Sequence, residues 1–461
     1  MDIDQTHWAP QRRRGPLPTF YYHEHFLEML DFVATHYAHV LLETHVAFIR
    51  DFRALPRDPQ CLYVRLVNRK GRVFAASKLR YPEIGDSRPL VKTLRETGWV
   101  TTPGAAHFED VLGFLTRAEI YAALLDSFTG MSRSLRKAEL IGFAREHCDP
   151  VEFMSRLDTD RLLVQARVDA VRYILFLYFG RIQEGLSQFT MRDLGLVRTQ
   201  SFKEHYEPRF SDRTEAQEHF YFASRLHDLG VAKDDDLLPY VQEITLWPEP
   251  EFAASAAVRD KYAYRLGRKL ERNNDKPAAL SVYRAGESTH CSERVIRLML
   301  ASGERDEAEK YLERCLENPR SDEEWLVAKD IYERKFRKKR TSSLTDLLRE
   351  AEVIDIDESR IGAPERAAAE YFEAKGWAAL RTENSIWRTL FGLLFWEELF
   401  TADHAAMHSP FEFLPGALTD GSYATHFAAQ IAGKLAQFDE RGGGRSTVLK
   451  ASTKYWGSRN G

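Results

Sequence analysis

The sequence predicts a mainly α-helical protein built from several domains. Apolar residues recur at helical spacing over most of the chain, and only one stretch alternates as a strand would. The 461 residues exceed what one hydrophobic core usually supports, so we expect two to four domains. A composition of 44% hydrophobic and 29% charged residues is ordinary for a globular protein.

The net charge and the cysteines limit which ligands and which cell compartment we expect for this protein. The formal net charge is −4, so any nucleic-acid surface must be local, for example at Arg12–Arg14 or in the basic run 334–340. The four cysteines are far apart and form no CxxC pair, which argues against disulfides and structural zinc. We therefore expect an intracellular protein.

No targeting or membrane segment is expected. The N-terminus has no apolar core of the kind a signal peptide needs. The longest apolar runs, Tyr173–Phe179 and Leu390–Trp396, are too short to cross a bilayer. Residues 1–18, which contain three prolines and an arginine triplet, are predicted to be a disordered tail.

Residues 19–150 are predicted to form the first domain. Two helices, 21–43 and 44–55, precede an alternating stretch from Cys61 to Val67, a turn at 68–71 and a return strand at 72–74. Two helices followed by a hairpin indicate a winged-helix-like unit. Its predicted tip carries Arg69, Lys70 and Arg72, which contact either solvent or DNA.

A second small unit is predicted within the same domain. Residues 108–147 are typical of a helix, a turn near Gly130 and a second helix that begins at Lys137. This order is typical of a SAP-type DNA-binding motif.

Residues 151–355 are predicted to be a helical repeat domain. The pattern of Tyr262, Leu266 and Leu270 followed by Ala278 and Val282 recurs approximately after residue 294. Helix pairs with small residues where they cross are typical of tetratricopeptide repeats, and the irregular spacing indicates a degenerate solenoid.

The last region, 365–461, begins with two predicted helices and is expected to become flexible at Gly442–Gly444. Glu383 precedes a strongly apolar helix, Ile386–Trp396, which we expect to be buried. A carboxylate at such a position needs a partner. That partner is either the helix dipole or a metal ion.

Two blocks of the sequence resemble the Fanconi anaemia-associated nuclease family, in particular its bacterial members. Leu62–Gly71 with Lys78–Ile84 resembles the N-terminal region, and Glu383–Glu397 resembles the start of the VRR-NUC domain, which His408–Glu412 extends. The matching regions extend across the whole chain and occur in the same order as in the family. This resemblance implies that residues 365–461 are the N-terminal part of a PD-(D/E)xK-type nuclease domain.

The resemblance implies a structure-specific DNA repair nuclease. Family members act as 5′-flap endonucleases and 5′–3′ exonucleases of the phosphodiesterase I type, and they unhook interstrand crosslinks with Mg²⁺ or Mn²⁺. DNA is the implied partner, in the bacterial cytoplasm or a eukaryotic nucleus. Glu383 matches an upstream catalytic and metal-binding glutamate.

The resemblance also implies DNA-contacting residues. The candidates are aromatic or basic side chains at matching positions: Tyr21, Tyr22, Arg69, Lys70, Arg72, Lys78, Arg80 and Lys137. A basic pocket for the DNA 5′ phosphate is implied in the repeats, with Arg259, Lys261 and Arg265 as candidates.

The family's remaining catalytic residues have no match between 384 and 461, where no Pro-Asp-Leu followed by Glu-x-Lys occurs. One glutamate cannot hold Mg²⁺, which needs several oxygen ligands. We therefore expect residues 1–461 alone not to hydrolyse DNA. The alternatives are a non-catalytic protein that binds flapped or branched DNA, and a tetratricopeptide adaptor that binds proteins.

Overall fold

The computed structural model describes residues 16–125, 127–128, 131–197, 206–233, 237–380, 385–400, 407–412, 414–420, 423–439 and 443–455. The predicted mainly α, multidomain fold is confirmed. Two compact units are present. The N-terminal unit comprises 1–216 with 406–416, and the C-terminal unit comprises 217–405 with 417–461. The predicted tail lies almost entirely outside the described residues.

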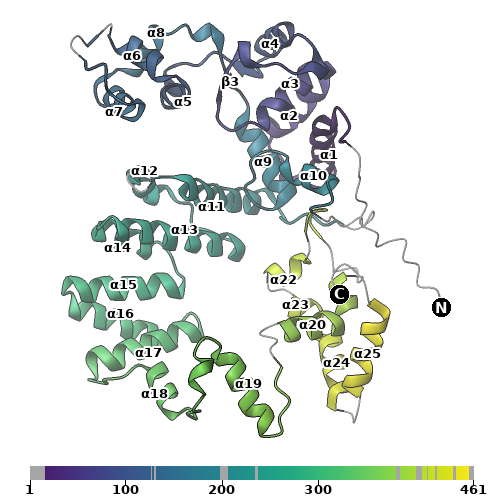
Figure 1. Ribbon diagram of the computed structural model, residues 1–461, viewed down its shortest axis with the longest axis vertical. Helices are drawn as coiled ribbons and strands as arrows, with labels where there is room; N and C mark the ends of the chain where they lie inside the picture. The colour runs from purple at the N-terminus through teal and green to yellow at the C-terminus, as the bar shows by residue number, and fades with distance from the viewer. Residues whose placement is uncertain are drawn as a thin grey trace. The chain divides into compact units, whose positions relative to one another are not determined.

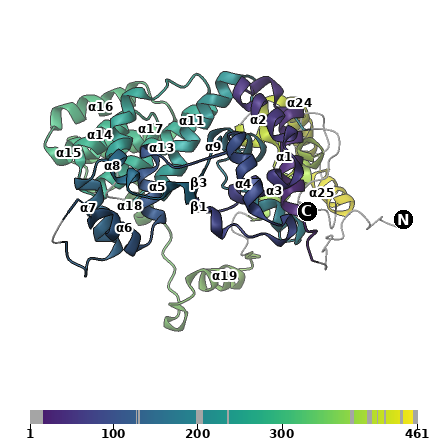
Figure 2. The same cartoon turned by 90° about the horizontal axis from the view of Figure 1, so that it is seen from above.

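The N-terminal unit holds two helical bundles joined by a small sheet (Figures 1 and 2). The first bundle contains α1 (Tyr21–His36), α2 (Glu43–Ala54), α3 (Arg57–Val67), α4 (Ser87–Glu96), α9 (Val168–Phe179) and α10 (Ser187–Asp193). The second contains α5 (Phe108–Phe114), α6 (Arg117–Leu125), α7 (Lys137–His147) and α8 (Pro150–Ser155).

The core of the first bundle is aromatic. Phe52 lies within 6.3 Å of Phe26, Phe48, Tyr63 and Trp99, measured between ring centroids. All five side chains are buried. Rings at these separations contribute beyond the burial of their area, so they fix how α1, α2 and α3 pack.

The predicted hairpin was wrong. Residues 61–67 lie in helix α3, and the sheet has the order β1 (Val73–Ala75), β3 (Leu162–Gln165), β2 (Val100–Thr101), all antiparallel. Helix α3 is buried on most sides, with Leu62, Tyr63 and Val64 all covered. A short run buried on every side has no periodicity that separates helix from strand. Strand β3 also interrupts the predicted helical repeat domain, 151–355.

The C-terminal unit begins with α11 (Arg213–Val231) and α12 (Leu238–Gln242), followed by antiparallel helix pairs (Figure 1). The pairs are α13 (Ala253–Arg272) with α14 (Lys276–Arg284) and α15 (Thr289–Ser302) with α16 (Arg305–Glu317). Helix α17 (Asp322–Phe336) packs against α15 and α16, and α18 (Ser343–Glu350) follows it.

Local chemistry sets these helix starts and crossings. Asp275, Ser288 and Ser321 each accept a hydrogen bond from a backbone N–H in the first turn of the helix that follows. At Gly267 a Cβ atom would lie 2.4 Å from the ring of Tyr283, so only glycine permits this close crossing of α13 and α14. The small residue expected at a repeat crossing is therefore present.

The remaining helices are α19 (Pro364–Ala374), α20 (Ser385–Leu394), α21 (Trp396–Phe400), α22 (Gly416–Asp420), α23 (Tyr423–His426), α24 (Ala428–Asp439) and α25 (Gly443–Tyr455). Helix α20 is less buried than predicted, since Trp387 is 70% exposed, whereas Phe395 and Leu399 beyond it are buried. Of the glycine triplet, Gly442 lies outside the described residues, whereas Gly443 and Gly444 lie in α25.

Residues 407–412 belong to the N-terminal unit although they follow the repeats in sequence. Phe411 packs 5.0 Å from Phe189 and 5.3 Å from Phe179, and Glu412 forms an ion pair with Arg209. Among the described residues, no helix is both long and apolar enough to cross a membrane.

Candidate nucleic-acid interface

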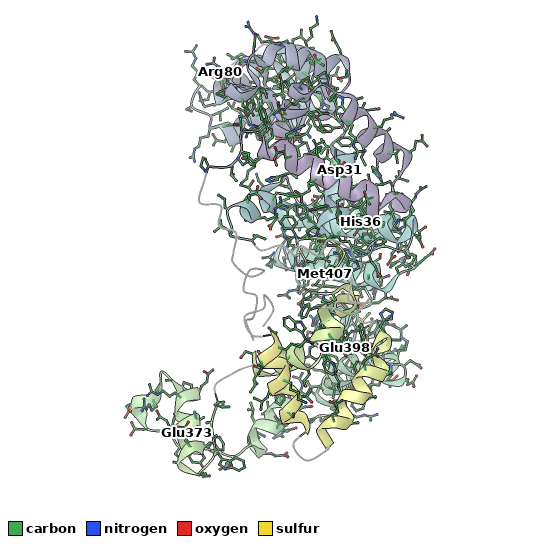
Figure 3. The ribbon with its side chains drawn as sticks, turned by 90° about the vertical axis from the view of Figure 1, so that its right-hand side faces the viewer. Asp31, His36, Arg80, Glu373, Glu398 and Met407 are labelled. Carbon is green, nitrogen blue, oxygen red and sulfur yellow. The ribbon has the colours of Figure 1, made fainter. Side chains whose placement is uncertain are left out.

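Five exposed cations follow one another after helix α3, and we call them the basic strip: Arg69, Lys70, Arg72, Lys78 and Arg80. None has a carboxylate partner among the described residues. Arg69 lies 5.7 Å from the ring centroid of Tyr81, and Arg80 is at the outer edge of its unit (Figure 3). Cations without carboxylate partners are available to neutralise phosphates.

A stack of side chains supports the basic strip from beneath. The Arg65 guanidinium lies 3.8 Å from the ring centroid of Tyr22 and 5.2 Å from that of Tyr81. Glu83 accepts hydrogen bonds from Tyr22 Oη at 3.1 Å and from Arg65 Nε at 3.0 Å. Partial burial would raise the pKa of Glu83, but its own backbone amide and Arg65 hold that pKa below its ordinary value.

The two candidate tyrosines have different environments. Tyr22 is only 2% exposed and its hydroxyl is occupied by Glu83, so it positions Arg65 and has no free face for a base. Tyr21 is half-buried and packs edge-on against Tyr22 and His25. Tyr21 is thus the better placed of the two for a stacking contact.

Lys137 starts helix α7 and is half-buried. Its Nζ donates to the backbone carbonyl of Gly113 at 2.7 Å, which ties α5 to α7. Arg117 similarly donates to the carbonyl of Leu135 at 2.8 Å. The exposed cations of this corner are Arg133 and Arg136. Sequence reasoning missed both, although they stand beside Lys137 in the chain.

The three candidate residues for the 5′ phosphate, all on α13, differ in burial and in ion pairing. Arg259 is 4% exposed and pairs with Glu287 at 2.8 Å, Asp260 at 3.1 Å and Glu249 at 3.4 Å. Burial opposes its charge, but these carboxylates raise the pKa of Arg259 above its ordinary value. Lys261 and Arg265 are exposed. Of the three candidates, only Lys261 and Arg265 therefore have side chains exposed to a ligand.

The basic run 334–340 is neutralised in part, because two of its six cations form ion pairs. Arg334 pairs with Asp330 at 2.6 Å, and Lys339 pairs with Glu333 and Asp346, each at 3.1 Å. The density of basic residues in the sequence therefore overstates the charge that this segment offers to a ligand.

The proposed metal ligand Glu383 lies outside the described residues. The carboxylates that follow it are paired with lysines: Glu398 with Lys434 at 2.6 Å and Glu397 with Lys454 at 2.9 Å. In the described part of the chain, no three His, Cys, Asp or Glu side chains gather closely enough to hold a metal ion. Because they are paired with lysines, Glu397 and Glu398 do not fit as ligands of Mg²⁺ or Mn²⁺, and we derive no catalytic step through a metal.

The fold and the candidate site define the class of protein. It is a helical-repeat protein whose N-terminal unit carries exposed cations without carboxylate partners among the described residues. A family model described as FAN1, HTH domain matches residues 20–101, which contain the whole basic strip. With the relatives described next, this match supports the resemblance of the chain to the Fanconi-associated nuclease family.

Curated relatives match along most of the chain. A Fanconi-associated nuclease 1 homolog of Pseudomonas aeruginosa is 27% identical over 460 residues, covering 93% of this chain and 79% of that protein. An Arabidopsis thaliana protein of the same name is 24% identical over 481 residues, covering 89% of this chain and 53% of its own length. The chain therefore spans about half of the plant relative.

Solved structures share the fold. A crystal structure of paFAN1 bound to DNA with a 2-nucleotide 5′ flap and a gap matches with a TM-score of 0.70 and 24% identity, covering 96% of this chain and 82% of that one. A second, with a 1-nucleotide flap, matches with a TM-score of 0.70 and 25% identity, covering 95% and 82%.

Proposed function

We propose that this protein binds 5′-flapped or branched DNA and acts in DNA repair as a structure-specific nuclease. The observation that carries the proposal is the basic strip, five exposed cations without carboxylate partners inside the region that matches the family's HTH model. Relatives named as nucleases and solved as flap-DNA complexes support it. Interstrand crosslink repair is the proposed biological role.

The strip fits recognition of the DNA backbone better than recognition of a base sequence. Lysine and arginine on a short turn can reach phosphates, which fix position and carry no sequence information. Arg133 and Arg136 at the start of α7 provide a second patch of the same kind. We propose that the two patches contact the duplex and that Lys261 or Arg265 contacts the 5′ phosphate. Recognition would then depend on DNA shape.

Hydrolysis is proposed to depend on Mg²⁺ or Mn²⁺ with Glu383 as one ligand. Within residues 384–461 no Pro-Asp-Leu followed by Glu-x-Lys supplies the other groups. We propose that residues 1–461, tested alone, bind flap DNA and leave it uncut. Manganese-dependent product release that Glu383→Ala abolishes would contradict this part of the proposal.

Salt-dependent binding tests the recognition step. Fluorescence anisotropy with residues 1–461 is expected to give a tighter Kd for a nicked duplex with a 5′ flap than for an intact duplex of equal length. The affinity should fall steeply with salt, because each phosphate contact contributes roughly −0.9 to the slope of log K against log salt. Equal affinity for both DNAs and a flat salt dependence would refute the proposal and favour an adaptor.

A further inference from the structure

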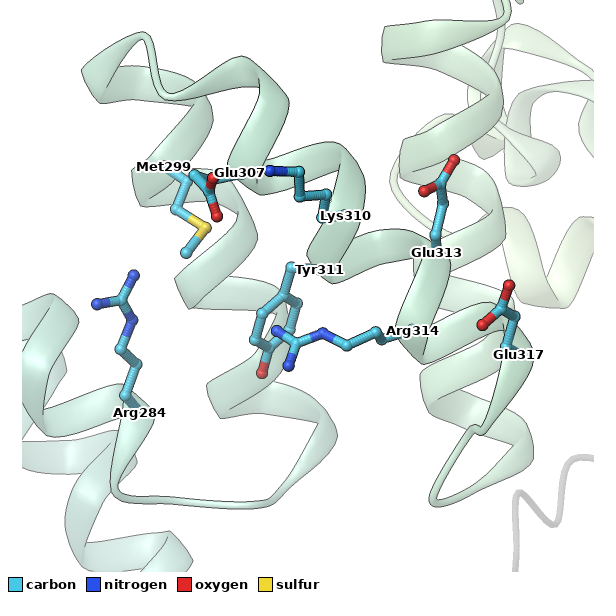
Figure 4. A pocket seen from close by; sticks show the side chains of 8 residues that line it. All are labelled: Arg284, Met299, Glu307, Lys310, Tyr311, Glu313, Arg314 and Glu317. Atoms are coloured by element: carbon cyan, nitrogen blue, oxygen red, sulfur yellow. Dashed lines mark hydrogen bonds and ion pairs between the residues drawn. The ribbon is translucent and has the colours of Figure 1, made fainter.

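A groove in the repeat domain has no role in the proposed DNA contacts. It has a volume of about 720 Å³ and lies between the helices α14, α15 and α16 (Figure 4). Its floor is apolar, formed by Met299, which is 4% exposed, and by the half-buried ring of Tyr311. The ring is held in place because Tyr311 Oη donates to Ser292 Oγ at 3.5 Å.

One end of the groove is cationic. Arg284 comes from the last turn of α14, and Arg314 extends from α16 over the ring of Tyr311, with its guanidinium carbon 5.0 Å from the ring centroid (Figure 4). Both arginines are exposed, and neither has a carboxylate partner among the described residues. By contrast, Arg294 on the adjacent α15 is paired with Glu271.

The other end of the groove is acidic. Glu313 and Glu317 line it on the side away from Arg284 (Figure 4). Glu313 accepts a hydrogen bond from Tyr332 Oη at 3.3 Å and keeps its negative charge uncompensated by a cation in the described residues. Two unpaired arginines, an apolar floor and two glutamates without a cation partner among the described residues thus line the groove. The remaining charged residues of the lining, Glu307 and Lys310, pair with each other at 3.2 Å.

This charge order selects the class of ligand. A nucleic-acid backbone carries only negative charge, so Glu313 and Glu317 would repel it. A polypeptide can place a carboxylate between two guanidiniums, an apolar side chain on the floor and a cation at the far end. Arginine–carboxylate pairs beside an aromatic face are among the stronger contacts that a surface can offer.

We propose that this groove binds an extended segment of a partner protein whose side chains run acidic, apolar, basic. Arg284 and Arg314 bind the acidic side chain, Met299 and Tyr311 contact the apolar one, and Glu313 with Glu317 bind the basic one. This peptide site is separate from the basic strip and does not depend on the proposed nuclease function.

The probe is a fluorescein-labelled peptide amide with the blocks Asp-Glu-Asp, Leu-Phe-Leu and Lys-Arg-Lys, titrated with residues 1–461 by anisotropy. We expect saturable binding by the unmodified chain, and at least tenfold weaker binding by R284E/R314E. The matched control is K276E/K329E, since Lys329 also lies over an aromatic ring, 4.6 Å from the centroid of Trp325, but outside the groove. The control should bind the peptide normally.

Three further measurements keep the proposal falsifiable. A peptide with serines in place of its apolar block should bind at least tenfold more weakly, and flap-DNA affinity should be the same in R284E/R314E and the unmodified chain. Loss of fold is excluded by an unchanged melting temperature, and Arg284→Gln is a milder variant at the exposed end of α14. Absence of saturable binding, equal binding by both double variants, or displacement of the peptide by a 5′-phosphorylated oligonucleotide would overturn the proposal.

Discussion

The basic strip of the N-terminal unit and three arginines of the repeats, Arg259, Arg294 and Arg320, carry the same charge in opposite environments. In the strip, five cations are exposed and without carboxylate partners in the described residues. In the repeats, Arg259 is buried among three carboxylates, Arg294 is paired with Glu271, and Arg320 is paired with Glu324 at 3.4 Å.

This difference indicates that ion pairing with carboxylates, more than the number of basic residues, decides whether a cation can bind a ligand. A buried charge must be paired or given up, because desolvation without compensation is costly. An exposed, unpaired charge contributes little to folding and is free for recognition. The four predictions below test this contrast.

The largest effect is expected from reversing charges in the basic strip. R69E/K70E/R72E should weaken flap-DNA binding about a thousandfold, or about 4 kcal/mol, because each lost phosphate contact is worth roughly tenfold at moderate salt. Anisotropy measures the affinity, and the melting temperature should not change. Neutralising the paired Arg334 and Lys339 to Gln is the matched control. Equal losses in both variants would contradict the contrast.

The second prediction concerns a buried group that gives up its charge. His45 stacks on Tyr173 with ring centroids 4.3 Å apart, and burial, with the nearby charge of Arg213, lowers the pKa of His45 to about 4. The unfolded value is about 6.5, so the stabilising effect is complete above that pH and is lost as the pH falls toward 4. The loss should reach the order of 3 kcal/mol.

Thermal unfolding between pH 7 and 4 measures this effect, and His45→Gln should remove most of that pH dependence. His107→Gln is the control, because the half-exposed His107 accepts a hydrogen bond from Gly104 N–H as His45 does from Leu42 N–H, each at 3.2 Å. A variant at position 45 with the same pH profile as the unmodified chain would disprove the assignment.

The third prediction tests a buried arginine. Arg259→Gln should destabilise the C-terminal unit by about 2 kcal/mol, because it leaves Asp260 without its cation and Glu287 with only the more distant Arg320, at 3.9 Å. Urea denaturation measures this change. Lys261→Gln, at an exposed position on the same helix, should leave stability unchanged and affect only DNA affinity. Equal stability of the two variants would show that the Arg259 pairs contribute nothing to folding.

The smallest effect concerns a helix cap in the second bundle. Glu119 accepts hydrogen bonds from Thr116 N–H and Oγ1, each at 2.7 Å, and these bonds, aided by Arg161, lower its pKa to about 2. Glu119→Ala should cost about 1 kcal/mol at pH 7. The difference should disappear as the pH falls from about 4.3 to 2. Glu146→Ala, on exposed α7 surface, is the control in thermal unfolding.

Local patterns predicted much of the fold. The helical spacing of Tyr262, Leu266 and Leu270 predicted α13, and Lys137 starts α7 as expected. The predicted hairpin failed because β1 pairs with β3, about ninety residues further along the chain. No local pattern encodes a pairing over that distance.

For the candidate site, the sequence predicted which basic residues are exposed at the strip, but it did not predict which candidate side chains are buried. Arg69, Lys70 and Arg72 were predicted at an exposed turn, because turn residues between buried elements are normally solvated. Lys78 and Arg80 were added by the family resemblance. The burial of Tyr22 and Arg259 was not predicted, since their partners Glu83 and Glu287 lie 61 and 28 residues away. Neither the spacing nor the residue type reveals such a partner.

The sequence by itself determined the helix-rich class, the family resemblance and where the basic residues occur, because periodicity, end caps and short blocks of residues are local properties. Only the tertiary structure decided which charges are paired, that residues 407–412 pack into the N-terminal unit, and that Arg284 and Arg314 line one groove with Tyr311. These features depend on residues distant in sequence that packing brings together, and the energy of a charge depends on that environment.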